Sequence, residues 1–186
     1  MLIDITLKIT PEMVKSAPEN GNRALTGHLG THFDVMNKEF PLDYTRREGV
    51  VFDVSSIRDR DIGVEDVDLN RVHPDMFAAF FTGYIEEVPY GSKAYFSAHP
   101  QLSDELIERL LDRGVSIIGV DCSGIRRGSQ HTPKDQYCAD RGAFVVENLC
   151  GLWALVQRGG RFIAHTYPMN YTGITGLPCR VIAEVE

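Results

Sequence analysis

The chain has 186 residues, of which 43% are apolar and 24% are charged, and its formal net charge is −7. This length and apolar content predict one domain over residues 1–186 with a substantial hydrophobic core. The negative charge and the lack of a long lysine or arginine run argue against nucleic acid or an anionic membrane as a partner, because little is present to neutralise phosphates.

The cysteines and the first residues bear on the cellular compartment. Four cysteines lack C-x-x-C spacing, which is typical of reduced, mostly buried thiols rather than of a disulfide framework or a sulfur-bound zinc: Cys122, Cys138, Cys150 and Cys179. The segment Met1-Leu2-Ile3-Asp4 has neither the basic start nor the apolar run of a signal peptide. We therefore expect a cytoplasmic protein.

The first half of the chain predicts mainly strands. Apolar runs indicate strands over residues 3–9, 50–54 and 79–83, and short helical turns are expected over 62–67 and 71–76.

The second half predicts alternating helices and strands. Ser103 is expected to cap a helix that ends at Gly114, and a buried strand over 115–120 follows, with Asp121 at its end as a turn or salt-bridge residue. The unit then recurs, with Thr132 as the N-cap of a helix, Gly142 near its end, a strand over 143–146, and Glu147 after the strand.

The last segments complete an α/β fold with a mixed sheet. A helical stretch through Trp153 is expected to end near Gly160, and strands are expected over 161–166 and 181–185. Open α/β sheets bind their ligands at the carboxyl ends of the strands. A carboxylate at such an end, as predicted for Glu147, is therefore favoured as a metal ligand.

The segment His28-Leu29-Gly30-Thr31-His32-Phe33-Asp34 places two imidazoles and a carboxylate within seven residues. Imidazole nitrogen suits zinc, and the carboxylate widens the choice toward manganese. Three protein ligands leave coordination positions open, which is typical of a catalytic metal site. The alternative is one surface histidine and one buried histidine beside an ordinary aspartate.

Neither regular structure would bring these side chains together. In a strand, His28 and His32 would lie roughly 13 Å apart; in a helix, Asp34 would point about 200° away from His32. We therefore expect a bend, for which Gly27 and Gly30 provide the backbone freedom.

The same segment resembles the H-x-G-T-H-x-D signature of the metal-dependent cyclase family, which includes bacterial kynurenine formamidases (arylformamidases) and isatin hydrolase. Later blocks resemble the family's in the same order: Thr82-Gly83, His99-Pro100-Gln101-Leu102-Ser103, Gly119-Val120-Asp121, Val146-Glu147-Asn148-Leu149 and Gly176-Leu177-Pro178-Cys179-Arg180. The resemblance implies the swivelling β/α/β fold and subunits that associate as a homodimer or homotetramer, so that a neighbour's loops complete the active site.

Carried over residue by residue, the resemblance implies that His28, His32, Asp34 and Glu147 bind metal. Two positions depart from the family pattern. Members usually continue D-x-P-x-H, where the last histidine is the general acid/base, but this chain has Lys38 there. Members also usually supply a metal-binding histidine twelve residues before the glutamate, where this chain has Asp135.

Each replacement has alternative roles. If desolvation or a nearby cation lowered its pKa, Lys38 could transfer protons; if protonated, it could stabilise developing negative charge; otherwise it is a solvated lysine beside Glu39. Asp135 is either a metal ligand or a carboxylate that stabilises the start of the helix, and His131 is the other candidate for the missing ligand.

A metal ion that polarises a carbonyl and activates water predicts hydrolysis of a small amide, lactam or ester. The expected activity is most similar to an arylformamidase of tryptophan catabolism acting on N-formylkynurenine, with zinc preferred over manganese. In this prediction Lys38 or another group moves the proton, and Glu147 completes the metal shell or orients the water. Two alternatives remain: a member that binds metal or metabolite without turnover, and a hydrolase of a different cyclic amide or ester. Most aromatic side chains are expected to pack the core, although six are possible pocket walls: Phe33, Phe40, Tyr44, Phe52, Tyr84 and Trp153.

Overall fold

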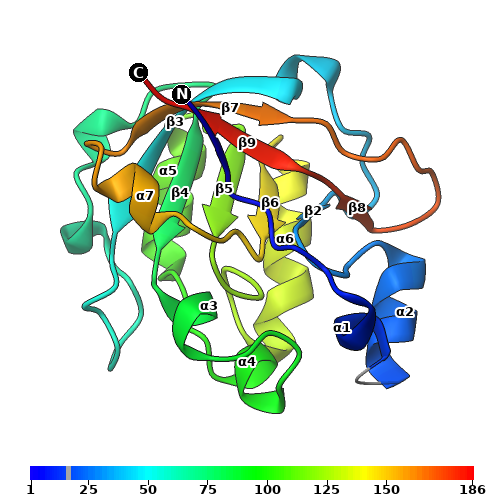
Figure 1. Ribbon diagram of the computed structural model, residues 1–186. Coiled ribbons are helices and arrows are strands. Elements are labelled where there is room, and N and C mark those ends of the chain that lie inside the picture. Colours follow the sequence, from blue (N-terminus) through cyan, green and yellow to red (C-terminus); the bar gives the residue numbers. More distant parts are fainter. Residues whose placement is uncertain (16–17) are drawn as a thin grey trace.

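The computed structural model describes residues 1–15 and 18–186. Its centre is a nine-stranded sheet in the order β1-β9-β7-β3-β4-β5-β6-β2-β8 (Figure 1). The strands are β1 Leu2–Asp4, β2 His32–Asp34, β3 Arg46–Asp53, β4 Phe77–Phe81, β5 Ile117–Val120, β6 Phe144–Glu147, β7 Arg161–Thr166, β8 Gly176–Pro178 and β9 Val181–Glu184.

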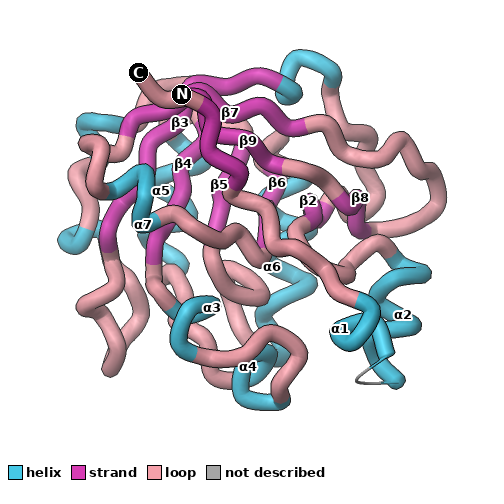
Figure 2. The backbone as a smooth tube through the Cα atoms, in the orientation of Figure 1, coloured by secondary structure: helices cyan, strands magenta, loops and turns pink. Residues whose placement is uncertain are grey.

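Short helices and long connections surround the sheet (Figure 2). The helices are α1 Pro11–Lys15, α2 Pro18–Thr26, α3 Tyr84–Glu87, α4 Lys93–Ser97, α5 Asp104–Asp112, α6 His131–Asp140 and α7 Trp153–Val156, with 3₁₀ turns at Leu42–Thr45, Val64–Asp66, Leu69–Arg71 and Gly128–Gln130. Among the described helices, none has the length and apolarity needed to cross a bilayer.

The sheet is mixed, as the sequence predicts. Strands β3, β4, β5 and β6 run parallel to one another, because a crossover connection returns the chain to the same end of the sheet each time. On one side β7, β9 and β1 continue the sheet antiparallel, and on the other side β2 pairs antiparallel with both β6 and β8. The carboxyl ends of four parallel strands therefore meet at one edge.

Alternate residues of the central strands pack into two separate cores. Phe80 and Ile118 face a cluster that includes Leu106 and Leu110 of α5, whereas Phe77 and Ile117 face the opposite cluster. Because both faces are covered, these strands are apolar almost throughout. Of the six aromatic residues considered as pocket walls, Phe33, Phe52 and Tyr84 are buried in these clusters, Phe40 and Tyr44 pack partly buried against one, and Trp153 is 44% exposed.

Helix α5 and the strands around it agree closely with the prediction. The Ser103 hydroxyl accepts a hydrogen bond from Leu106 N at 3.1 Å, which confirms the N-cap, and β5 follows as a buried strand. Asp121 is a turn residue: its carboxylate accepts hydrogen bonds from the backbone N–H groups of Thr82 and Gly83, so it joins the ends of β4 and β5.

Other elements differ from the prediction. The strand expected over 3–9 stops at Asp4, because the Asp4 side chain accepts a hydrogen bond from Thr6 N and turns the chain, and α1 begins at Pro11. The helical turn expected over 71–76 lies earlier, at Leu69–Arg71. The short elements α1, α2, α3, α4, β2 and β8 were not predicted, since none has a long apolar period.

Candidate metal centre

Strand register places three of the candidate ligands on one face. Strands β2 and β6 are antiparallel, and His32 lies directly opposite Glu147, the last residue of β6. Side chains that face each other across a strand pair lie on the same side of the sheet, as do residues two apart in one strand. Asp34 therefore shares this face, and the His32 Nε2 atom lies 3.6 Å from Asp34 Oδ1 and 3.6 Å from Glu147 Oε2.

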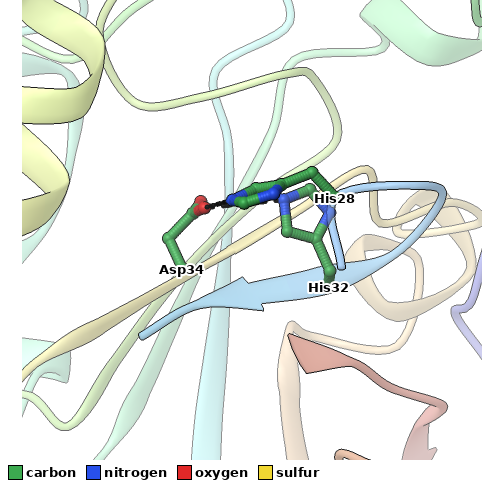
Figure 3. A group of neighbouring side chains, drawn as sticks. All are labelled: His28, His32 and Asp34. Carbon is green, nitrogen blue, oxygen red and sulfur yellow. Dashed lines mark ion pairs between the residues drawn. The ribbon is translucent and has the colours of Figure 1, made fainter. Parts of the chain in front are cut away.

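A bend before β2 brings His28 to the same place. Gly27 and Gly30 both adopt positive φ angles, of 82° and 75°, so the segment turns where the sequence predicts. The His28 and His32 rings lie edge to face with their centroids 4.9 Å apart, and His28 Nε2 is 3.2 Å from Asp34 Oδ1 (Figure 3). The three side chains of the signature thus converge.

Helix α6 supplies two more side chains. The helix begins at His131, and residues four apart lie on the same helix face, so His131 and Asp135 point the same way. The His131 Nε2 atom lies 3.2 Å from Asp135 Oδ2 and 2.8 Å from Glu147 Oε1.

The start of α6 corrects the sequence prediction. Thr132 is not the N-cap, because the helix begins two residues earlier than predicted, at His131, and its N-cap is Gln130, which makes no side-chain capping bond. Asp135 makes no capping bond either; it is only 2% exposed, and it faces His131. Helix capping therefore does not explain this carboxylate.

The convergent side chains form two groups that share one residue. The first contains His28, His32 and Asp34, and the second contains Asp34, His131, Asp135 and Glu147; within each group the possible ligand atoms lie within 4.8 Å of one another. The sequence predicts His28, His32, Asp34 and Glu147 as ligands and offers Asp135 and His131 as candidates for a missing one, and the fold brings all six into these two groups.

The geometry and the unpaired atoms fit a metal ion. Ligands held about 2.1 Å from a tetrahedral zinc lie about 3.4 Å apart, which is close to the 3.2 and 3.6 Å between the imidazoles of the first group and Asp34 Oδ1. Three buried atoms of the two groups have no hydrogen-bond partner among the described residues: His32 Nε2, Asp34 Oδ2 and Asp135 Oδ1. Since buried polar atoms are nearly always paired, these atoms point to a ligand.

Without a metal, the acidic surroundings hold protons on two imidazoles. Burial by itself lowers the pKa of His32, but the charges of Asp34 and Glu147 outweigh burial and raise the pKa to about 9. Burial likewise opposes the charge on His131, yet its hydrogen bond and charge interaction with Glu147 raise the pKa to about 10. Both imidazoles must lose a proton before they bind a metal.

The two buried aspartates shift in opposite directions. Burial raises the pKa of Asp34, but the adjacent His32 and His28 outweigh burial and hold this pKa below its usual range. The pKa of Asp135 is raised, first by burial and then by the negative charge of Asp34. A divalent cation would relieve this repulsion between carboxylates.

Lys38 is engaged outside these two groups. Its Nζ atom lies 2.6 Å from Asp140 Oδ1 at the last residue of α6, and its side chain is 39% exposed. The ammonium thus has a partner on the protein surface, which the sequence did not predict.

A buried hydrogen-bond network behind His32 was missed by the sequence analysis. The Gly30 carbonyl accepts hydrogen bonds from His32 Nδ1 at 2.8 Å and from Asn148 Nδ2 at 2.9 Å. The Tyr95 hydroxyl donates to Asn148 Oδ1 at 2.7 Å. Because Nδ1 donates to this carbonyl, Nε2 is the nitrogen that faces the site and offers its lone pair once the imidazole has lost a proton. Asn148 follows Glu147 in a block with family resemblance, but Tyr95 lies in the unpredicted helix α4 and gave no signal.

Comparisons with known proteins agree with the family resemblance. A family model described as "Putative cyclase" matches residues 3–126, which include His28, His32 and Asp34 but not His131, Asp135 or Glu147. No curated protein matched the chain.

Solved structures share the fold. A potential metal-dependent hydrolase with cyclase activity has a TM-score of 0.75 and 20% identity, covering 100% of this chain and 98% of its own. A predicted metal-dependent hydrolase from Bacillus stearothermophilus has a TM-score of 0.73 and 20% identity, with coverage of 98% and 97%. Isatin hydrolase A from Labrenzia aggregata, bound to benzyl benzoate, has a TM-score of 0.75 and 19% identity, with coverage of 98% and 93%. The family model spans about two thirds of the chain, and the protein belongs to the cyclase family.

Proposed function

We propose that this protein is a metal-dependent hydrolase of a small amide, lactam or ester. The observation that carries the proposal is the pair of ligand groups that share Asp34 and leave three buried ligand atoms unpaired. The metal-dependent hydrolases among the structural neighbours support the same class of reaction.

In this proposal the first group holds the metal through His28, His32 and Asp34. The second group, which also contains Asp34, offers a further metal-binding position through His131, Asp135 and Glu147. Nitrogen and carboxylate donors suit zinc, and manganese is the alternative. When bound, the metal supplies Lewis acidity toward a carbonyl oxygen and lowers the pKa of water.

We assign to Glu147 the role of orienting the attacking water. One of its oxygens accepts from His131 Nε2 at 2.8 Å and the other lies 3.6 Å from His32 Nε2, so the carboxylate is fixed between the two groups. In that position it orients an attacking water and holds the proton that the water releases. Burial of His32, Asp34 and Glu147 excludes bulk water around the reaction.

An aryl substrate is supported by a cavity next to the site. The cavity has a volume of about 830 Å³, a size typical of ligand pockets, and although none of the six ligand residues lines it, its lining residue Thr175 has its Oγ1 3.5 Å from His28 Nε2. Its lining includes Phe40, Tyr167 and Tyr171. We propose an arylformamidase-like specificity on this basis, with a cyclic aryl amide such as isatin as the other substrate.

The surface ion pair of Lys38 favours a second candidate function. With Nζ held by Asp140, the family position of the general acid/base supplies no proton carrier to the two ligand groups. The protein would then bind a metal and a metabolite without turnover.

One experiment separates the two functions. Metal-depleted protein is reconstituted with zinc or manganese and offered N-formylkynurenine, isatin and other aryl amides and esters, together with Lys38→Ala and Lys38→His. Hydrolysis by the unaltered protein supports the hydrolase, and its loss in Lys38→Ala would make the lysine catalytic. An inert protein in which only Lys38→His hydrolyses the substrate would establish the binding function instead.

We also propose a homodimer or homotetramer. Four exposed apolar or aromatic side chains surround the same cavity and would be covered in an assembly: Leu42, Tyr167, Met169 and Tyr171. Light scattering coupled to size-exclusion chromatography measures the mass, and a monomer at micromolar concentration would contradict this proposal.

A further inference from the structure

The connection between β5 and α6 contains a run of unpaired backbone N–H groups. Residues 121–126 are all buried. Within the described part of the chain, the N–H groups of Ser123, Gly124, Ile125 and Arg126 donate to no acceptor. More than nine in ten buried backbone N–H groups are paired in folded proteins, so four in succession indicate a place where a ligand or water accepts them.

The carbonyl groups of this loop hold it in place. The Cys122 carbonyl accepts from Asn148 N at 3.0 Å, and the Ile125 carbonyl accepts from Leu102 N at 3.0 Å. Across a trans peptide the next N–H points away from the carbonyl, and no described peptide bond is cis. The loop is therefore held by its Cys122 and Ile125 carbonyls, while the N–H groups of Ser123 and Arg126 point away from Asn148 and Leu102.

Gly124 brings the loop against the ligand groups. A Cβ atom added to this glycine would lie 3.0 Å from His131 Nε2 and 3.2 Å from Glu147 Oε1, and its φ of 122° is rarely adopted by other residues. Because two bonds of about 1.5 Å separate that Cβ position from the Gly124 nitrogen, the nitrogen lies within about 6 Å of His131 Nε2.

We propose that the N–H groups of residues 123–126 form an oxyanion-binding loop. Its ligands are the negatively charged oxygen of a carbonyl under attack and the carboxylate of the product. The proposal rests on the hydrolase function above. The ligand groups carry three buried carboxylates, Asp34, Asp135 and Glu147, and backbone N–H dipoles provide positive potential for a substrate oxygen without a charged side chain.

During hydrolysis the loop contributes only hydrogen bonds from its N–H groups. As the oxygen of water bonds to the carbonyl carbon, the π electrons of the C=O bond move to the carbonyl oxygen, and the loop N–H groups stabilise that charge. When the C–N or C–O bond breaks, the C=O bond re-forms, the leaving group takes a proton released by the water, and a carboxylate remains.

The test uses the full chain labelled with ¹⁵N, both zinc-loaded and metal-free, with acetate as a carboxylate probe. We expect the amide protons of residues 123–126 to move downfield and to saturate together in the zinc-loaded protein. Replacing Ile125 by its α-hydroxy analogue removes one N–H without adding an atom. We expect it to weaken acetate binding about ten-fold and leave zinc binding unchanged.

Gly124→Ala and Gly128→Ala are a matched pair of variants. The first places a methyl group against His131 Nε2, whereas a Cβ added to Gly128 meets no atom within 4 Å, although both glycines have positive φ. We expect Gly124→Ala to lose acetate binding and Gly128→Ala to keep it.

The inference is overturned if saturating acetate moves none of the four amide signals in either form, or if the Ile125 ester binds acetate as tightly as the unaltered chain. The hydrolysis assay described above decides the proposed function separately: a zinc-loaded chain that hydrolyses a substrate but shows no amide response to acetate loses only the oxyanion-binding loop.

Discussion

Two buried charged regions of this molecule differ in how completely their atoms are paired. The Arg126 guanidinium is 6% exposed, and it donates to Asp61 Oδ2 at 2.8 Å, to the Leu102 carbonyl at 2.7 Å and to the Gln130 side chain. In the metal-ligand groups, by contrast, three buried atoms have no partner among the described residues, and three carboxylates lie close together.

The difference teaches how to tell a structural charge from a functional one. Burial of a charge costs free energy in both regions. Around Arg126 that cost is offset by hydrogen bonds inside the protein, so nothing further is required. In the ligand groups the imidazoles of His28 and His32 offset the cost at Asp34, but burial and the charge of Asp34 raise the pKa of Asp135, and the unpaired atoms mark where a cation would bind.

The largest effect is expected for Asp34→Asn, because Asp34 belongs to both ligand groups. At a free zinc concentration about 1,000 times its Kd, zinc should stabilise the unaltered protein by about 4 kcal/mol. For a chain of this size that corresponds to a rise in Tm of about 8–16 °C. The variant should lose this rise. Calorimetry with and without zinc measures it, and an unchanged rise in the variant would rule out Asp34 as a ligand.

The next effect is a pH dependence of metal binding. In the metal-free protein the pKa values of His32 and His131 are raised to about 9 and 10, so both imidazoles are protonated at pH 7 and zinc must displace two protons. Zinc affinity should therefore rise by about two orders of magnitude per pH unit between pH 7 and 9. Titration calorimetry in buffers of different ionisation enthalpy counts the protons released.

Stability without metal should change in the opposite sense. A histidine whose pKa is higher in the folded than in the unfolded protein stabilises the fold. This stabilisation is complete below the unfolded pKa of about 6.5 and is lost as the pH rises through the folded pKa. The Tm of the metal-free protein should thus fall between pH 7 and 10, while zinc affinity rises between pH 7 and 9. Parallel pH profiles would contradict this assignment of the protons.

A smaller effect is expected for Tyr95→Phe. The Tyr95 hydroxyl holds Asn148, which shares the Gly30 carbonyl with His32. Loss of such a supporting hydrogen bond should weaken zinc binding about 10-fold, because His32 is less firmly oriented. Tyr84→Phe is the matched control, since the Tyr84 hydroxyl donates to the Ala94 carbonyl instead. Equal zinc affinities for the two variants would show that the network does not orient His32.

The smallest effect is expected for Asp61→Asn, which changes a partner of the Arg126 guanidinium. Because the Asp61 side chain is 38% exposed, loss of its charge should cost at most about 1 kcal/mol. Zinc affinity should stay within about two-fold of the unaltered protein, since Asp61 is in neither ligand group. A large fall in zinc affinity would mean that the two regions are coupled.

Much of the fold and of the candidate site follows from the sequence. Helix α5 was predicted because Ser103 caps it and its apolar residues repeat with a helical period, and β5, β6 and β7 were predicted from apolar or alternating runs. The convergence of His28, His32 and Asp34 follows from two glycines at the bend. These signals are local, so they can be read without the fold.

The remaining features depend on contacts between distant residues. Strand β8 has only three residues and exists because it pairs with β2. The ion pair of Lys38 with Asp140 and the contact of Tyr95 with Asn148 join residues far apart in the chain. The start of α6 was predicted two residues too late, because Thr132-Pro133 is a common helix start, whereas the helix begins at His131.

The spacing of His131 and Asp135 on α6 has a consequence for how such proteins diverge. A helix returns to the same side of its axis after four residues, so an imidazole lost at one position can be regained one turn earlier while still reaching Glu147. A sequence alignment that compares position 135 alone would find no histidine in this chain, although α6 places His131 near the same point in space.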